Sequence, residues 1–378
     1  MKKVITLSSG TAIIFGAIAL QSAHAQTSVT LYGVIDEALR FTTHQNTGSG
    51  SKSQLGLSEG AFNGPRWGLR MSEDLGGGNK AFALLESGFN LNTGKSDQQG
   101  QLFGRQLYMG FSNPTWGALR AGRQYGTLYS LMATVDPLGT ANIPELDWPS
   151  FFTGLRYDNT LDYQNKLGPM NVEVQYSFGN QAGSTSIGRT LGASLWYGTP
   201  ALTAGVAGQQ SRDAVNHKAQ LAMIVGKGSY GPLSLYGYYG HSTKDAGFRI
   251  GTSGTTDPLA NTSLASNYNT VAGTGTQTAG RIDNLFVLAT SYKFTSTLNV
   301  IGGWMLDLAQ GVAGADSGRT QTYYATVVYS LSKRTDIYAE VDYDRLSGAA
   351  KTDVNGLLAG FGGANTRVGA IGGLRVRF

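Results

Sequence analysis

The fold is decided by the stretch Arg367-Val-Gly-Ala-Ile-Gly-Gly-Leu-Arg-Val-Arg-Phe378. Its residues alternate between two faces, which is the period of a β-strand. One face carries Val368, Ala370, Gly372, Leu374, Val376 and Phe378. The other face carries Arg367, Gly369, Gly373, Arg375 and Arg377, with Ile371 as the one exception. Three arginines on one face indicate that this face meets water while the opposite face meets an apolar medium.

The same alternation recurs along the chain and is clearest between residues 336 and 344. There the polar set Asp336, Glu340, Asp342 and Asp344, with Tyr338, opposes Ile337, Ala339, Val341 and Tyr343. The pattern predicts sixteen strands, at 29–41, 66–72, 80–92, 102–112, 115–125, 156–165, 171–178, 188–198, 200–210, 216–228, 231–242, 282–295, 296–307, 319–331, 335–346 and 366–378. The chain is therefore predicted to be all-β.

The connections between these strands alternate in length. Tight turns rich in Gly, Asn and Pro separate longer gaps at 42–61, 93–101, 126–153, 243–281, 308–318 and 347–365. Short turns at one rim and long loops at the other are typical of outer-membrane barrels. Charged residues facing a dry core would cost several kcal/mol each, about the penalty of an unpaired buried charge. A 16-stranded antiparallel transmembrane β-barrel with a water-filled lumen avoids that cost, and pairing of the first and last strands would close it.

The first residues predict export. Lys2 and Lys3 precede an apolar run, and Ala23-His24-Ala25 offers a cleavage site, so residues 1–25 are predicted to be a cleaved signal peptide. Residues 26–378 then form a single barrel domain in the bacterial outer membrane. The chain has no cysteine, which excludes thiol catalysis and cysteine-ligated metal sites. A net charge of +5 on an exported chain of 378 residues gives little reason to expect nucleic acid as a partner.

Residues 126–153 interrupt the strand pattern. They contain three prolines, the acids Asp136, Glu145 and Asp147, and the aromatic residues Trp148, Phe151 and Phe152. Loops of this length are usually functional or disordered, and the aromatic residues favour an ordered loop packed against the wall. A path of aromatic residues for sugars is the alternative.

Several segments together resemble the trimeric general porins of Gram-negative outer membranes, in particular their β-proteobacterial branch. The matching segments are Val29-Thr-Leu-Tyr-Gly33, Arg66-Trp-Gly-Leu-Arg-Met-Ser-Glu-Asp-Leu-Gly-Gly-Gly78, Leu85-Glu-Ser-Gly-Phe-Asn90, Gly104-Arg-Gln-Leu-Tyr-Met-Gly-Phe-Ser112, Ala121-Gly-Arg-Gln124, Arg156-Tyr-Asp-Asn159 and Gly373-Leu-Arg-Val-Arg-Phe378. They run from the start of the predicted mature chain to its last residue, and their combination is specific.

The resemblance implies a homotrimer whose third outer loop, here residues 126–153, folds into each barrel and narrows it. It implies a basic wall of Arg66, Arg105 and Arg156, with Arg70 and Arg123 as neighbours, facing the loop acids Glu145, Asp136 and Asp147. Pro144-Glu145 is similar to the family's loop motif, whereas Leu146-Asp147-Trp148 departs from the usual Phe-Gly-Gly. The terminal Phe378 resembles the signal that the barrel-insertion machinery reads. Membrane lipid and lipopolysaccharide would surround the barrel, and no cofactor or metal is implied.

These features predict a general diffusion porin for small hydrophilic solutes and ions, with a modest preference for anions. Some arginines could instead brace the loop or pair with wall carboxylates such as Asp158 and Asp162. A substrate-specific channel for a sugar or an organic acid is the alternative function. A barrel hydrolase is less favoured, because His44, His217 and His241 lie in no catalytic motif and a nucleophile needs an adjacent base.

Overall fold

The structure is a computed structural model that describes residues 27–251, 259–264, 279–312 and 316–378; the predicted signal peptide lies outside them. Seventeen β-strands, two α-helices and two short 3₁₀ helices make up the described chain. In order they are β1(Ser28–Asn46), β2(Ser51–Glu59), β3(Arg66–Gly76), β4(Asn79–Gly88), η1(Gln98–Gly100), β5(Gln106–Asn113), β6(Gly117–Tyr125), α1(Thr127–Ala133), α2(Pro144–Phe152), β7(Arg156–Leu167), β8(Met170–Ser177), β9(Thr190–Gly198), β10(Leu202–Arg212), β11(Lys218–Tyr230), β12(Leu233–Lys244), β13(Arg281–Lys293), β14(Leu298–Val312), β15(Asp316–Ser330), β16(Thr335–Gly348), η2(Ala349–Lys351) and β17(Thr366–Arg377).

The seventeen strands form one closed antiparallel sheet, the barrel wall, in which the chain makes sixteen passes. On one edge, β1 pairs with β17, from Val34 opposite Arg377 to Thr42 opposite Gly369. On its other edge, β1 pairs with both β2 and β3, which therefore act as a single interrupted strand. Each later strand pairs with the next one along the chain. The predicted sixteen-stranded barrel, closed between its first and last strands, is confirmed.

Some predicted boundaries were wrong. The stretch 42–61 was predicted to be a loop, but β1 continues to Asn46 and β2 occupies Ser51–Glu59. Only Leu55 and Leu57 mark the outward face of β2, so its alternation is faint among small polar residues. The gap at 308–318 is also shorter than predicted, because β14 runs to Val312 and β15 begins at Asp316.

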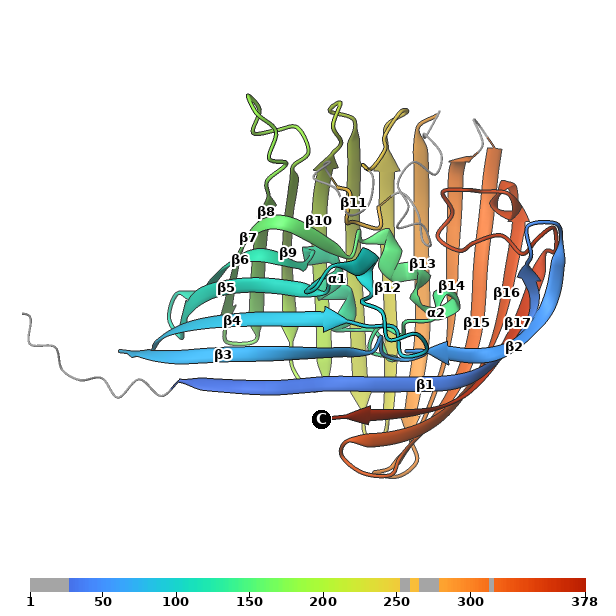
Figure 1. Cartoon of the computed structure of the whole chain (residues 1–378), viewed down its shortest axis with the longest axis horizontal. Coiled ribbons are helices and arrows are strands. Elements are labelled where there is room, and N and C mark those ends of the chain that lie inside the picture. The colour runs from blue at the N-terminus through green and yellow to red at the C-terminus, as the bar shows by residue number, and fades with distance from the viewer. Residues whose placement is uncertain (1–26, 252–258, 265–278, 313–315) are drawn as a thin grey trace, which may run out of the picture.

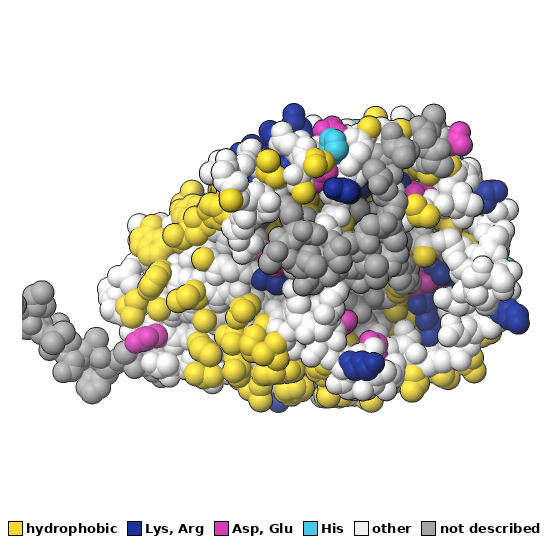
Figure 2. Space-filling view, turned by 45° about the horizontal axis from the view of Figure 1, so that its top comes forward, with side chains coloured by type: hydrophobic (Ala, Val, Ile, Leu, Met, Phe, Trp, Pro, Cys, Tyr) yellow, Lys and Arg dark blue, Asp and Glu magenta, His cyan; other side chains and the backbone are white. Residues whose placement is uncertain are grey.

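The outer surface of the barrel carries an apolar band. Figure 2 shows hydrophobic side chains gathered over the left and lower parts of the view, away from most charged groups. Exposed apolar residues of the strands all round the barrel include Leu39, Met109, Val206, Ile224 and Leu288, each at least half exposed. Apolar side chains that point out of a closed sheet are expected where the surrounding medium is hydrocarbon. No described helix is both long enough and apolar enough to cross a membrane.

The inward faces fall into two kinds. Strand β16 presents Asp336, Glu340, Asp342 and Asp344 inward, as the alternation predicts, and all four are buried. Strands β11 and β13 instead present Leu221, Met223, Val225, Leu285 and Val287 inward at mid-length. The expectation of a polar inner face on strand after strand therefore fails on this side of the barrel.

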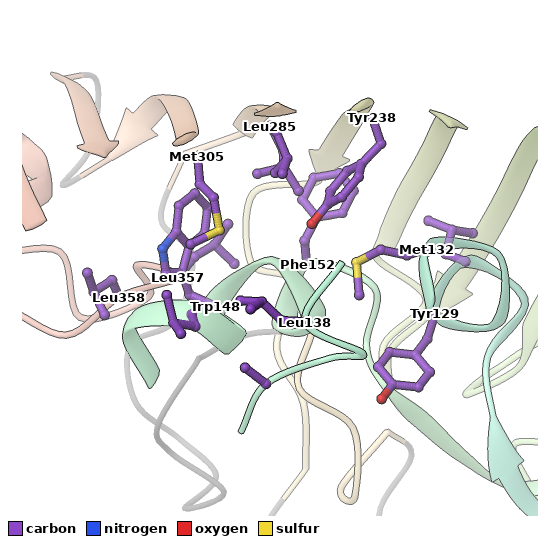
Figure 3. Close-up of a cluster of buried hydrophobic side chains, with 14 of the residues drawn as sticks. Tyr129, Met132, Leu138, Trp148, Phe152, Tyr238, Leu285, Met305, Leu357 and Leu358 are labelled. Atoms are coloured by element: carbon purple, nitrogen blue, oxygen red, sulfur yellow. The ribbon is translucent and has the colours of Figure 1, made fainter. Parts of the chain in front are cut away.

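The helices α1 and α2 and the loop before β17 cover that apolar part of the wall. In Figure 1 the strands β1–β6 cross the view in front, the strands β10–β15 stand behind, and α1 and α2 lie between them. Helix α1 packs against β9, β10 and β11. Side chains of α2 and of the loop before β17 share a cluster with the wall, including Trp148, Phe152, Leu285, Met305 and Leu358 (Figure 3).

Candidate functional site

Four of the five predicted basic residues line one cavity beside α2. Arg66, Arg105, Arg123 and Arg156 surround a space of about 270 Å³. Of the three predicted loop acids, only Asp147 lines it as well. Tyr129, Asn142 and Thr140 complete the wall on the side of the 126–153 segment.

The strand order explains why the four arginines meet. Arg66 begins β3, Arg105 directly precedes β5, Arg123 lies near the end of β6, and Arg156 begins β7. Arg105, Arg123 and Arg156 lie where strands join the longer connections, whereas Arg66 follows the short break at 60–65 that separates β2 from β3. Because β3 to β7 are consecutive neighbours in the sheet, these positions stack side by side along one arc of the wall.

Two of these arginines are compensated by carboxylates of the wall. Arg105 Nε donates to Glu86 Oε1 at 2.9 Å, and Arg123 Nη1 donates to Asp158 Oδ1 at 2.5 Å. This pairing agrees with the alternative reading in part, since Asp158 was one of the carboxylates considered; Asp162 pairs with Arg120 instead, at 2.8 Å.

The other two arginines carry uncompensated charge. Among residues 27–251, 259–264, 279–312 and 316–378, neither Arg66 nor Arg156 makes an ion pair. Arg156 Nη2 donates to the hydroxyl of Tyr125 at 3.0 Å, and its guanidinium lies 4.7 Å from the centre of that ring. The Tyr125 hydroxyl also accepts from Arg105 Nη2 at 3.2 Å, so one tyrosine holds two guanidinium groups in place.

Asp147 is the one acid of the loop that opposes these charges across the cavity. It is in the first turn of α2. Burial raises the pKa of its carboxyl to about 7, although a hydrogen bond from Ser150 acts in the opposite direction. The carboxylate is therefore only partly ionised near neutral pH, and the cavity keeps a positive excess.

The remaining predicted residues lie elsewhere. Arg70 does not line the cavity; its guanidinium lies 4.5 Å from the centre of the Tyr32 ring. Asp136 accepts backbone N–H groups of Leu138 at 2.8 Å and Thr140 at 3.0 Å, so it shapes a turn of the loop. Burial raises the pKa of the Asp136 carboxyl to about 6.

Glu145 anchors the 126–153 loop to the strands β1 and β17. Its carboxylate contacts Arg40 Nη2 of β1 at 2.6 Å and also contacts Arg367 of β17. Burial alone would raise the pKa of Glu145, but these two guanidinium groups hold it below its ordinary value. The sequence placed Arg367 on a polar face, but nothing in it indicated that Glu145 is the partner of Arg367 and Arg40.

The loop aromatics pack into the barrel interior. The Trp148 side chain is fully buried, and its Nε1 donates to Thr322 Oγ1 of β15 at 3.0 Å. Phe152 is buried beside Gly240 of β12. Both contacts support loop packing rather than an open path for sugars.

The terminal residue takes part in closing the sheet. The backbone of Phe378 exchanges two hydrogen bonds with Gly33 of β1, at 3.0 and 3.1 Å. Its ring lies over the Cα of Gly33, where any added Cβ would clash with it.

Comparison with known proteins places this barrel in a family. Residues 10–349 match the family described as Gram-negative porin. The chain belongs to the Gram-negative porin family. This porin is 30% identical over 377 residues to an outer membrane porin protein of Bordetella pertussis, across 91% of this chain and 94% of that protein. It is 28% identical over 206 residues to outer membrane porin protein 32 of Delftia acidovorans, across 51% and 57% of the two chains.

Solved porin structures share the fold. The anion-selective porin from Comamonas acidovorans superposes with a TM-score of 0.71 at 21% identity, covering 93% of this chain and all of that one. OmpT of Vibrio cholerae gives a TM-score of 0.64 at 12% identity, covering 93% and 98%. The predicted family resemblance is confirmed, and the chain is a channel-forming porin of the outer membrane.

Proposed function

We propose that this porin is a general diffusion channel with a modest preference for anions, and that residues 126–153 are its constriction loop. The observation that carries the proposal is the cavity between the loop and the wall, with two paired arginines and two unpaired ones, Arg66 and Arg156. Charges that line a narrow pore select ions, because little water remains to screen them.

The balance of charge gives the sign of the preference. Glu86 and Asp158 compensate Arg105 and Arg123, and Asp147 is partly protonated near neutral pH. Asp97 also lines the cavity. The four arginines, less Glu86, Asp158, Asp97 and the partial charge of Asp147, therefore leave a positive excess of between zero and one charge. The anion-selective porin of Comamonas acidovorans has the same fold, and its selectivity supports the same sign here.

The assembly and targeting of this porin follow from its family. We expect a homotrimer in the outer membrane, as a trimer form is known for the structurally similar OmpT. A signal peptide at residues 1–25, contact with lipid and lipopolysaccharide, and recognition of Phe378 by the barrel-insertion machinery complete the proposal.

Salt-gradient reversal potentials in planar bilayers test the selectivity. The intact porin should pass chloride better than potassium, and Arg105→Ala should shift the reversal potential toward cations because Glu86 then loses its partner. A cation preference of the intact porin, or an unchanged potential in Arg105→Ala, would contradict the proposed constriction.

Two other functions would give different experimental results. A substrate-specific channel would show saturable block of its current by one sugar or acid. A hydrolase would need a base beside a nucleophile. His217 Nδ1 lies 3.0 Å from Asp213 Oδ2 and His241 Nδ1 lies 3.0 Å from Asn284 Oδ1, and within the described chain neither ring is hydrogen-bonded to a serine. Lipid or peptide hydrolysis that is lost in His241→Ala would favour the enzyme.

A further inference from the structure

A second cavity lies at the opposite end of the barrel interior, where the short turns are. We name it the turn-side vestibule. Its volume is about 840 Å³, roughly three times that of the arginine cavity. The β13–β14 turn, the β15–β16 turn and the end of β17 enclose it, and the loop residues Pro137 and Leu138 form its inner limit.

The deep side of the vestibule is apolar. Phe62, Leu138, Ile301 and Val328 line it together. The Phe62 ring packs edge-on against Tyr338, with 4.3 Å between ring centres, which fixes the aromatic surface in place. An inorganic ion gains nothing from such a surface, whereas a hydrocarbon or aryl group buried there gains about 25 cal/mol per Å².

The outer side of the vestibule is basic. Lys293, Lys333, Arg375 and Arg377 line it, and Asp336 is the one acid among its lining residues. Asp336 Oδ2 already accepts from Arg375 Nη2 at 2.9 Å and from Arg377 Nη1 at 2.7 Å. In the described part of the chain neither Lys293 nor Lys333 makes an ion pair. The outer side, which we call the rim, therefore has an excess of positive charge. It lies opposite the deep apolar side, which we call the floor.

We propose that the turn-side vestibule is a binding subsite for small amphipathic organic anions, in which a carboxylate is attached to an aryl or alkyl body. The carboxylate lies between Lys293 and Lys333, and the apolar body rests on Phe62, Ile301 and Val328. The volume falls within the roughly 300–1,000 Å³ of typical small-molecule sites. The proposal rests on the proposed function only in that the lumen must be open to solutes.

The subsite gives the channel a preference that its arginine cavity does not supply. The arginine cavity acts on the charge of any ion that passes. The vestibule adds a second criterion, because only an anion with an apolar body can use both its rim and its floor. Such solutes would reside longer at the short-turn end of the lumen than chloride or acetate does.

Isothermal titration of the purified porin tests this with three probes: 3-phenylpropionate, acetate and 3-phenylpropanol. Only 3-phenylpropionate has both the charge and the apolar body, so it should bind saturably and at least tenfold more tightly than either of the others. The double variant Lys293→Ser/Lys333→Ser should weaken its binding about tenfold, from the loss of two charges near the carboxylate. Val328→Thr, which keeps the side-chain shape, should weaken it roughly threefold by making the floor more polar.

Lys227→Ser is the matched control. Lys227 lies near the short-turn end of β11 but does not line the vestibule. Its ammonium group lies 5.5 Å from the centre of the Tyr236 ring. Its substitution should leave the binding of 3-phenylpropionate unchanged. Equal binding of acetate and 3-phenylpropionate, or an equal loss in Lys227→Ser and in the double variant, would overturn the subsite.

Reversal potentials of the same preparations separate the two proposals. A porin that prefers chloride but fails to bind 3-phenylpropionate retains its proposed function without this subsite. A porin that binds 3-phenylpropionate but prefers potassium has the subsite without the proposed anion preference.

Discussion

Removing the charge of Arg66 should lower the anion preference of this porin more than removing the charge of an exposed arginine in a short turn. The variant is Arg66→Gln, which keeps a polar side chain of similar reach. Arg66 is chosen because it lines the cavity and makes no ion pair among the described residues, so its loss leaves no wall carboxylate unpaired. Arg105 and Arg123 lack this advantage because each has a carboxylate partner.

The size of the cavity sets the expected magnitude. A sphere of about 270 Å³ has a radius of roughly 4 Å, so an ion at its centre is about 6 Å from the guanidinium charge. With the dielectric constant of water, a unit charge at that distance is worth about 0.7 kcal/mol. The effect has opposite sign for an anion and a cation, so their difference is about 1.4 kcal/mol. In 0.1 M salt, screening reduces this to roughly 0.8 kcal/mol, or about a fourfold change in the chloride-to-potassium permeability ratio.

Reversal potentials across a tenfold salt gradient measure that ratio, and Arg334→Gln provides the control. Arg334 is exposed in the short turn between β15 and β16 and does not line the cavity, so removing it changes the net charge equally but outside the cavity. Its effect should be below twofold. Equal shifts in the two variants would refute the reasoning, since selectivity would then follow the net charge of the porin and not the constriction. An unchanged ratio in Arg66→Gln would refute the placement of the ion path.

Three further outcomes follow from the same contacts. The anion preference should rise as pH falls from 8 to 5.5, because burial raises the pKa of Asp147 to about 7 and the carboxyl loses its charge over that range; reversal potentials of Asp147→Asn should stay flat. Asp353→Asn should increase current noise in single-channel recordings, because Asp353 Oδ2 accepts Arg281 Nη1 at 2.8 Å and this bond, worth about 1–3 kcal/mol, ties the loop before β17 to β13. Deleting Phe378, which shares two backbone hydrogen bonds with Gly33, should reduce the fraction of folded barrel on unheated gels much more than it alters the conductance of the channels that form. Normal assembly of that truncated porin would contradict the role given to the terminal residue.

The wall could be predicted from the sequence because the alternation of polar and apolar residues within each strand shows which face is which. The alternation around Asp342 and Asp344 is local, and it shows the correct inward face without any knowledge of neighbouring strands. Strand β2 escaped prediction for the same reason, since Leu55 and Leu57 alone give too short an alternation. The four cavity arginines were found through the family resemblance and brought together by the order of the strands.

The interior could not be predicted in the same way, because its contacts join distant parts of the chain. Glu145 is 105 positions from Arg40 and 222 from Arg367, and no local pattern connects them. The apolar inward face of β11 looks, in the sequence, like a strand buried on both sides. Only the packing of α1 against it shows why Met223 avoids water inside a barrel.

Under the proposed function, the division of the interior accounts for how a wide barrel would discriminate between ions. Charges on the wall of an open lumen would act across distances close to the Debye length, about 10 Å in 0.1 M salt, and would be largely screened. In the constriction that we propose, packing Trp148 and Phe152 against one side leaves the solute path on the side of the arginines. On that proposal, the apolar contacts of the loop and the ion pairs of Glu145 act on selectivity through distance, because they keep a passing ion within a few ångströms of Arg66 and Arg156.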